Sequence, residues 1–421
     1  MKTIKLMLIA FFAPLQFLLA QEAVTLEQCQ KWARENHPAL KQLEIYQQIL
    51  DLKNQSNSTS YLPQVTLNGQ GTYQSAVTKI GLSLPNIKIP TVDKDQYKVY
   101  LDLKQTIWDG GITKAKEKLN TAENAGNLQQ TEVDVYQVKD RVNQFFFTTF
   151  LIQENLKILE KKVETLAERQ KIMDSAVKNG VLLSSELDQI LAEQIKTRQQ
   201  LIELNSTLET VRYALSIITG KTTEQFQRLA LTDEASASDK PLMRPELGLF
   251  SKQAELLDAN SALLKKQRNP KLFGFGQAGY GRPGLNMLST TFDTYYMVGV
   301  GFSWNVFDWK TTNRQQQVLK LQKEIIQTKE NAFVQSIDIA TDQQQKQIQQ
   351  INDLLKTDQE LIEVRERITK TSASKLENGT ITSADYIQDL NSEVTARLTQ
   401  ETHKIQLTEA NVKLANIRGI Q

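Results

Sequence analysis

Four carboxylates follow shortly after two Asn-Gly turns, and they are the residues whose type and spacing come closest to a chemical site. The set comprises Glu186, Asp188, Asp385 and Asp389. One interpretation is that they are helix-start carboxylates, which the helix dipole favours. The other is that they form a ring of negative charge that narrows a pore mouth when several copies of the chain meet. None has a partnering histidine, and no arrangement of nucleophile and general base accompanies them, so the sequence predicts no enzyme.

A second pattern, Gly274-Phe-Gly276-Gln-Ala-Gly279, matches the dinucleotide-binding sequence G-x-G-x-x-G. That fingerprint requires a helix that opens within it, whereas an alternating run follows here, so we interpret these glycines as small strand residues. One cysteine, Cys29, and two histidines exclude an internal disulfide and argue against a Cys/His metal site. The net charge of +2 gives no electrostatic argument for nucleic acid. The sequence therefore predicts no cofactor, no metal and no nucleic-acid partner.

The first twenty residues follow a different pattern from the rest of the chain. Lys2 and Lys5 precede an apolar run from Leu6 to Ala20, which predicts a secretory signal peptide over residues 1–20 and an exported mature chain. An N-terminal membrane anchor is the alternative, although the run is short for a spanning helix. No later segment approaches eighteen consecutive apolar residues, so any later membrane segment must consist of β-strands.

One stretch, from Lys310 to Glu377, contains neither glycine nor proline. Its apolar residues step by threes and fours, which predicts a single helix of roughly 100 Å at 1.5 Å per residue. A shift of 199 residues superposes Asp109 on Asp308, Asn179-Gly180 on Asn378-Gly379 and Gly220 on Gly419 without insertion. We therefore predict an internal duplication.

The duplication predicts two repeats after the signal peptide, joined by a connector. The first repeat, 21–220, has a β-hairpin at about 64–108, a long helix at about 112–178 interrupted only at Gly126, and a return helix at about 184–219. The second repeat, 242–421, has a hairpin at about 271–307, a long helix at about 310–377 and a return helix at about 383–418, and the connector covers 221–241. Ser185 or Thr382 can cap the return helices, with Asp188 or Asp385 three residues later as in a capping box.

Both expected hairpins contain runs of about ten residues with the two-residue period of strands, a length that suits a tilted transmembrane strand. We expect the lipid-facing side chains to be Val99, Leu101, Leu103, Val298, Val300 and Phe302. Phe273 and Phe275 do not match the parity of Val65 and Leu67, and the alternation alone does not explain this. A four-stranded sheet in a soluble protein is the alternative.

Several features together resemble the TolC family of outer-membrane efflux channels. They are the signal peptide, the segment Thr25-Leu-Glu-Gln-Cys29 followed by Asn36-His37-Pro38, the duplicated unit of helix, hairpin, long helix and return helix, and turns of the form Asn-Gly-x-x-x-Ser. The resemblance covers essentially the whole mature chain. It implies a mixed α and β fold, in which a long antiparallel α-helical coiled-coil barrel continues a transmembrane β-barrel completed by trimerisation. Four strands per chain cannot close a barrel alone, which independently requires oligomerisation.

The resemblance also implies a function and a location. The chain would be an outer-membrane channel-tunnel of a Gram-negative bacterium with a large periplasmic part, conducting solutes passively as the exit duct of a tripartite efflux or secretion system. Its partners would be two further copies of itself, outer-membrane lipid, and a periplasmic adaptor (membrane fusion protein) that connects it to an inner-membrane pump. A soluble periplasmic coiled-coil adaptor or scaffold is the alternative.

The two turns would form the periplasmic tip that contacts the adaptor. The tip residues are Asn179, Gly180, Val181, Leu182, Ser184, Asn378, Gly379, Thr380, Ile381 and Ser383. Family members with two acidic residues three apart in the second tip form a constricting ring. Here Gln388 stands three residues after Asp385, and Asp389 follows it, so the sequence departs from that pattern.

Overall fold

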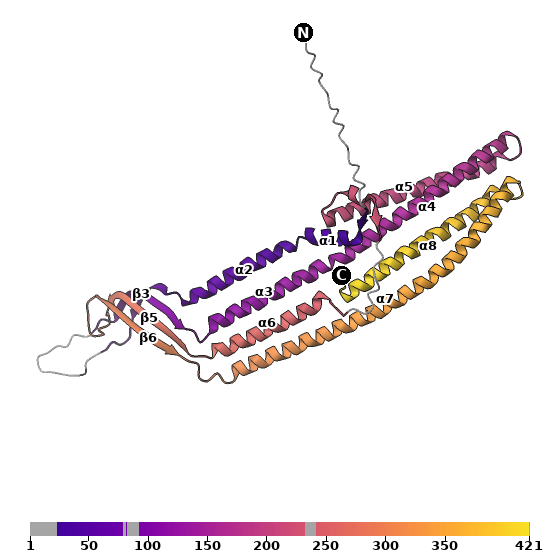
Figure 1. Cartoon of the computed structure of the whole chain (residues 1–421). Helices are drawn as coiled ribbons and strands as arrows, with labels where there is room; N and C mark the ends of the chain where they lie inside the picture. The colour runs from indigo at the N-terminus through magenta and orange to yellow at the C-terminus, as the bar shows by residue number, and fades with distance from the viewer. Residues whose placement is uncertain (1–22, 79–80, 82–91, 232–240, 421) are drawn as a thin grey trace, which may run out of the picture. The chain divides into compact units, whose positions relative to one another are not determined.

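The structure, a computed structural model, describes residues 23–78, 81, 92–231 and 241–420, which fold into two compact units (Figure 1). The strand unit comprises residues 38–137, 239–343 and 417–421, and the tip unit comprises residues 1–37, 138–238 and 344–416. The expected signal peptide, residues 1–20, lies outside the described residues, as does 232–240 of the expected connector. Within the part of the chain that the structure describes, each helix is too short or too polar to cross a membrane.

The strand unit combines helices with a four-stranded antiparallel sheet. Its elements are α2 (Leu40–Ser58), the 3₁₀ turn η1 (Thr59–Tyr61), β2 (Gln64–Tyr73), β3 (Asp95–Trp108), α3 (Ile112–Tyr136), α6 (Pro245–Gln267), β5 (Lys271–Arg282), β6 (Asp293–Ser303) and the first half of α7 (Thr311–Glu377). The strand order is β2-β3-β5-β6, which leaves β2 and β6 as the two edges. Helices α2, α3 and α6 lie side by side in the same order as the strands they adjoin (Figure 1).

The tip unit is helical except for one short pair of strands. Its elements are β1 (Val24–Thr25), α1 (Leu26–Asn36), α4 (Val138–Lys178), α5 (Ser184–Thr219), the 3₁₀ turn η2 (Thr223–Gln227), β4 (Leu229–Ala230), the second half of α7 and α8 (Ser383–Arg418). Strands β1 and β4 pair in parallel beside a core that contains Phe146, Phe147, Leu215 and Phe226. Cys29 is fully buried in this core, and burial raises the pKa of its thiol to about 12.

The sheet places apolar and polar side chains on opposite faces. Leu101 pairs with Leu67 on one side and with Ala278 on the other, and the apolar face continues to Val298 and Val300 on β6. The register also accounts for the parity of β5: Phe273 and Phe275 lie on the polar face, opposite Gly301 and Gly299. Bulky aromatic residues are accommodated there because the neighbouring strand has no side chains at these positions.

Two expected boundaries differ from the structure. The first long helix does not run unbroken from 112 to 178; it divides at Gln137, while Gly126 lies inside α3 without a break. The strand expected to run to 307 ends at Ser303. Beyond that point the Trp304 indole Nε1 donates a hydrogen bond of 3.1 Å to the Arg268 carbonyl at the end of α6, which directs the chain away from the sheet.

A buried carboxylate fixes the junction between β3 and α3. Asp109 accepts hydrogen bonds from the Gly111 amide (2.8 Å), the Thr113 amide (2.5 Å) and the Tyr61 hydroxyl (2.8 Å). Gly110 and Gly111 both have positive φ, and a Cβ on Gly110 would lie 2.5 Å from Asn269 Cβ. Burial opposes ionisation of Asp109, but the hydrogen bonds from Thr113, Tyr61 and Gly111 outweigh it and lower its pKa to about 2.

A similar junction with different residues lies between β6 and α7. Asp308 accepts from the Lys310 amide (3.1 Å), the Thr312 amide (3.0 Å) and the Thr312 hydroxyl (2.5 Å). Trp309 and Lys310, the two residues after Asp308, have positive φ, as Gly110 and Gly111 have after Asp109. Hydrogen bonds from Thr312 lower the pKa of Asp308. The same carboxylate cap therefore begins both helices that follow the hairpins.

Replacing Asp109 with alanine should lower the free energy of unfolding by about 1–2 kcal/mol at neutral pH, as loss of a helix-capping carboxylate does. The folded pKa of about 2 lies below the ordinary value of 3.8, so the stabilisation by the ionised group is present above about pH 4 and is lost as the pH falls toward 2. The wild type and Asp109→Ala should therefore converge in acid. Helical circular dichroism during guanidinium unfolding in detergent, near pH 7 and near pH 2.5, measures this.

Asp353→Ala is the matched control, because this carboxylate on α7 is 63% exposed and pairs only with Lys356, at 2.9 Å. An exposed pair of this kind contributes little. A gap between the wild type and Asp109→Ala that stays constant from neutral to acid pH would contradict the assigned ionisation.

Candidate functional site

The two helical turns of the tip unit have the same backbone structure. At the first, the Gly180 amide donates to the Val177 carbonyl (2.9 Å) and the Val181 amide donates to the Ala176 carbonyl (2.9 Å). At the second, Gly379 and Thr380 make the equivalent bonds to Leu376 and Lys375 (3.0 and 2.9 Å). Both patterns are Schellman motifs, which require a left-handed residue at the glycine position. Gly180 and Gly379 have φ of 72° and 66°.

The helices that leave the turns begin differently. In the second tip the Asp385 amide donates to the Thr382 hydroxyl (3.2 Å), and the Thr382 amide donates to Asp385 Oδ2 (3.0 Å), which completes a capping box. Hydrogen bonds from the Thr382 side chain and then its amide lower the pKa of Asp385. In the first tip Ser185 lies inside α5 and Leu183 precedes the helix without a side-chain cap, so the expected cap at Ser185 is wrong.

One carboxylate connects the two tips. Glu186, in the first turn of α5, accepts a hydrogen bond of 2.6 Å from the backbone amide of Ser383, the first residue of α8. The Ser383 side chain is fully buried. A negative group at a helix N-terminus also interacts favourably with the helix dipole. Glu186 therefore supplies α8 with a cap from the other helical hairpin.

The structure does not bring the four carboxylates into one cluster. Asp389 accepts a hydrogen bond from the Ser372 hydroxyl of α7 and is half-buried, whereas Asp188 and Asp385 are exposed. Within the described ranges, no three His, Cys, Asp or Glu side chains are arranged to hold a metal ion. Two of the four, Glu186 and Asp389, are thus engaged between helices, and the other two face solvent.

A compact apolar core lies immediately behind the tips. Tyr386 is 1% exposed and packs with Met173, Ile190, Leu376 and Leu390. Burial raises the pKa of the Tyr386 hydroxyl. The tip residues Leu182 and Ile381 pack on the same core, while Val181 and Leu183 are each 73% exposed. Neither Leu183 nor Tyr386 was among the expected site residues, although the spacing of Tyr386, Leu390 and Val394 is that of a buried helical stripe.

Two cations sit among these apolar residues. The Arg169 guanidinium lies 5.2 Å from the centre of the Tyr386 ring and pairs with Glu377 at 2.5 Å. Farther along α4, Lys162 Nζ pairs with Glu193 Oε1 of α5 at 2.5 Å, and both side chains are less than 10% exposed. Buried pairs of this kind specify how helices meet, because either partner alone would be an uncompensated charge. Their sequence signal is a basic residue within the apolar stripe Leu159, Leu166 and Met173.

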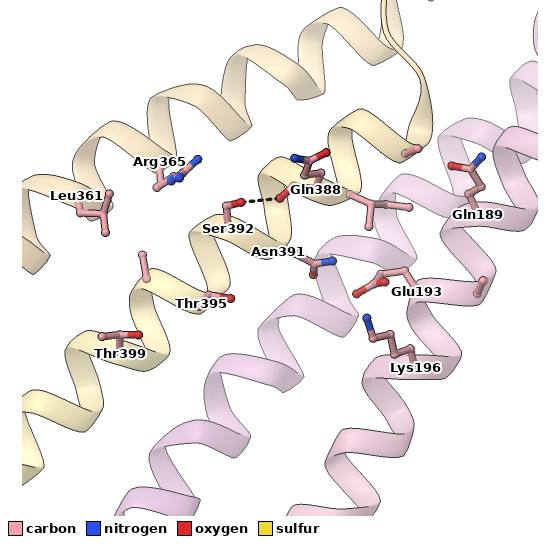
Figure 2. A pocket seen from close by; sticks show the side chains of 14 residues that line it. Gln189, Glu193, Lys196, Leu361, Arg365, Gln388, Asn391, Ser392, Thr395 and Thr399 are labelled. Atoms are coloured by element: carbon pink, nitrogen blue, oxygen red, sulfur yellow. Dashed lines mark hydrogen bonds between the residues drawn. The ribbon is translucent and has the colours of Figure 1, made fainter.

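A groove of about 850 Å³ lies between α7 and α5, with α8 as its floor (Figure 2). Most of its exposed lining area is apolar, and charged and polar groups border it, among them Glu193 and Lys196 on α5, Arg365 on α7 and Asn391 on α8 (Figure 2). The Ser392 hydroxyl donates to the Gln388 carbonyl at 2.8 Å, one helical turn earlier (Figure 2). The groove therefore combines a largely apolar surface with charged groups of both signs.

The expected lipid-facing residues lie on one face of the four-stranded sheet. Val99, Leu101, Leu103, Val298, Val300 and Phe302 share the parity set by the strand pairing and are all exposed. Val65 and Leu67 on β2 extend the same face. An isolated chain therefore exposes a continuous apolar surface across the sheet.

Comparison with known proteins identifies the family. The sequence model described as "Outer membrane efflux protein" matches residues 31–221 and 243–419, which is most of the chain. The chain belongs to the outer membrane efflux protein family. This is a family of channel proteins, homologous to the outer-membrane channels of tripartite efflux systems in Gram-negative bacteria, and a soluble adaptor is not favoured.

Solved structures share the fold at low sequence identity. The CmeC outer membrane channel of Campylobacter jejuni superposes with a TM-score of 0.64 and 17% identity, over 94% of this chain and 85% of that chain. The outer membrane protein VceC of Vibrio cholerae gives a TM-score of 0.66 and 12% identity, over 94% and 96%. The open state of the Neisseria gonorrhoeae MtrE channel gives 0.64 and 13%, over 94% and 89%. The comparison with curated protein sequences finds no match.

Replacing Glu186 with alanine should release the Ser383 amide from its partner on the other tip. Amide hydrogen exchange in a peptide that covers residues 380–386 should accelerate roughly tenfold, because a hydrogen bond to a charged group is lost where no other acceptor replaces it. Asp188→Ala, which removes an exposed carboxylate two residues further along α5, is the control and should leave the exchange unchanged. Equal exchange rates in both variants would show that Glu186 does not join the tips.

Proposed function

We propose that the protein is the outer-membrane exit duct of a tripartite efflux or secretion system, and that it conducts solutes passively. Three copies of the four-stranded sheet supply twelve strands for a closed transmembrane barrel, and the helices continue it as a periplasmic tunnel. Residues 1–20 direct export, and no covalent chemistry is involved. Three chains, outer-membrane lipid, an adaptor and, through the adaptor, an inner-membrane pump form the assembly.

The observation that carries this proposal is the apolar face of the sheet. Val298 is 77% exposed and Val300 is 67% exposed, although valines are usually buried in folded proteins. The opposite face bears polar residues such as Gln277, Asp102 and Lys104. This alternation suits strands with lipid on one side and water on the other.

The edges of the strand unit support association with further copies of the chain. Strands β2 and β6 have unpaired outer edges, and an exposed edge readily pairs with another strand. The edge helices carry exposed apolar stripes at helical spacing: Ile45, Ile49 and Leu52 on α2, and Val318, Leu321 and Ile325 on α7. In this arrangement, β2 and the α2 stripe of one copy meet β6 and the α7 stripe of the next copy. The interface is head-to-tail and closes as a ring of three chains.

The two turns are the proposed contact with the adaptor. Exposed apolar side chains at a helical turn, Val181 and Leu183 here, suit a protein partner better than water. Of the four carboxylates considered, Asp188 and Asp385 are the two exposed ones, so a ring of charge formed from this set at the pore mouth would use them. Glu186 and Asp389 instead hold α8 to its neighbouring helices.

Arginine at Val298 should impair membrane assembly by roughly 2–4 kcal/mol, the cost of a cation on a lipid-facing strand near the bilayer midplane. Met297, the neighbouring residue on β6, lies on the polar face and is exposed, so Met297→Arg is the matched control. The measurement is the fraction of protein recovered in outer membranes after urea extraction. Equal losses in both variants would reverse the assigned faces, and extraction of the wild type by urea would contradict the duct.

Valine at Gly180 or Gly379 should abolish export while trimers still form. Each glycine has a left-handed backbone, and a branched side chain there costs about 1 kcal/mol or more of strain. A Cβ meets no atom within 4 Å at either position, so the defect stays local to the turn. Gly126→Val, in the middle of α3, is the control. Substrate efflux from cells and the trimer band in mild detergent are measured, and normal efflux by both tip variants would move the adaptor contact elsewhere.

A further inference from the structure

The polar face of the sheet carries an aromatic cluster. Phe273 and Phe275 on β5 have their ring centres 6.4 Å apart, inclined by 47°. Lys104 on β3 pairs across the strands with Phe275, and its Nζ lies 5.1 Å from the centre of the Phe273 ring. We call Phe273, Phe275 and Lys104 the aromatic-lysine site.

The rings lie along the sheet because glycines face them. A Cβ built on Gly299 would lie 2.5 Å from Cζ of Phe275, and a Cβ on Gly301 would overlap the ring of Phe273. The ring ends therefore extend over the backbone of β6 and occupy the space that side chains would take. Rings in this orientation are half-buried, with one side against the strand and the other open.

Lys104 leaves a positive charge available beside these rings. Its side chain is exposed, and it forms no ion pair with any carboxylate in the described part of the chain. The same face of β3 carries Lys98 and Asp102, so the charged residues of this strand sum to one positive charge on the polar face. The Lys104 ammonium thus lies beside the Phe273 ring without a carboxylate partner among the described residues.

We propose that the aromatic-lysine site binds small aromatic anions on the channel wall and makes aromatic anions a preferred class of permeating solute. A planar ring stacks against Phe273 or Phe275 while its carboxylate or sulfonate pairs with the Lys104 ammonium. This inference rests on the proposed function, in which the polar face lines the channel. In a trimer, three copies of the site surround the same section of the pore.

The alternative role of the rings is to shield the glycine backbone of β6, and this role predicts no ligand. Aromatic residues do cover cross-strand glycines in sheets. Shielding alone requires no cation, however, and leucine at position 273 or 275 would cover the glycine backbone nearly as well. The two roles therefore differ in what a Phe→Leu change does to ligand recognition.

The test is current through the purified full-length protein in planar bilayers. The probe is naphthalene-2-sulfonate, with methanesulfonate as the anion without a ring and trimethylphenylammonium as the aromatic cation. In the wild type, naphthalene-2-sulfonate should block at a concentration at least tenfold below that of either control. Phe273→Leu, Phe275→Leu and Lys104→Gln should each raise its half-blocking concentration several-fold.

Two variants on the same face are the matched controls. Met297→Leu changes an exposed side chain two residues from Gly299 on the same face but keeps both rings and Lys104, so it should leave the block unchanged. Lys98→Gln removes the same charge as Lys104→Gln at a position four residue pairs beyond Asp102, and it should lower anion selectivity without altering the preference for a ring.

Other results would overturn the inference. Three results would show that the rings only shield the β6 backbone. They are equal block by methanesulfonate, stronger block by the aromatic cation, and unaltered block in Phe273→Leu and Lys104→Gln. Lys104 is exposed, so its replacement tests the site even if a phenylalanine variant fails to assemble. A wild-type protein that conducts no current would instead contradict the proposed function itself.

Discussion

The incompleteness of the sheet is the constraint on which the rest of the structure depends. Four strands leave two open edges and one face of exposed valine, leucine and phenylalanine, a surface that a single chain cannot satisfy. The order of α2, α3, α6 and α7 repeats the strand order, so the helical edges coincide with the strand edges. In the proposed assembly, the same neighbouring copy would extend both the strand layer and the helix layer.

Local sequence patterns account for the elements that depend on periodicity and backbone conformation. The glycine-free stretch from Lys310 to Glu377 corresponds to α7 at Thr311–Glu377, because a single helix obeys short-range rules. The two Asn-Gly turns form Schellman motifs because left-handed backbone favours glycine there. The family also followed from the sequence, since a duplicated architecture is a longer and more specific signal than a short motif.

Features that depend on contacts between residues far apart in the sequence could not be predicted from local sequence patterns. The Glu186 carboxylate and the Ser383 amide are separated by 197 positions, so no local pattern joins them. The break at Gln137 has neither glycine nor proline to mark it, and the boundary between the two units falls there. Phe273 and Phe275 lie on the polar face because Gly299 and Gly301 on β6 face them. The alternation within β5 alone does not reveal this pairing.

The bond between Glu186 and Ser383 has an evolutionary consequence. Its donor is a main-chain N–H, which every amino acid except proline supplies, so the link does not depend on the serine side chain. Selection to keep this hydrogen bond would require a side chain that can accept it at position 186. At position 383 selection would act only on the size of the side chain, because that side chain is fully buried. The two positions would therefore show little covariation among homologues, even though they form a direct connection between α5 and α8.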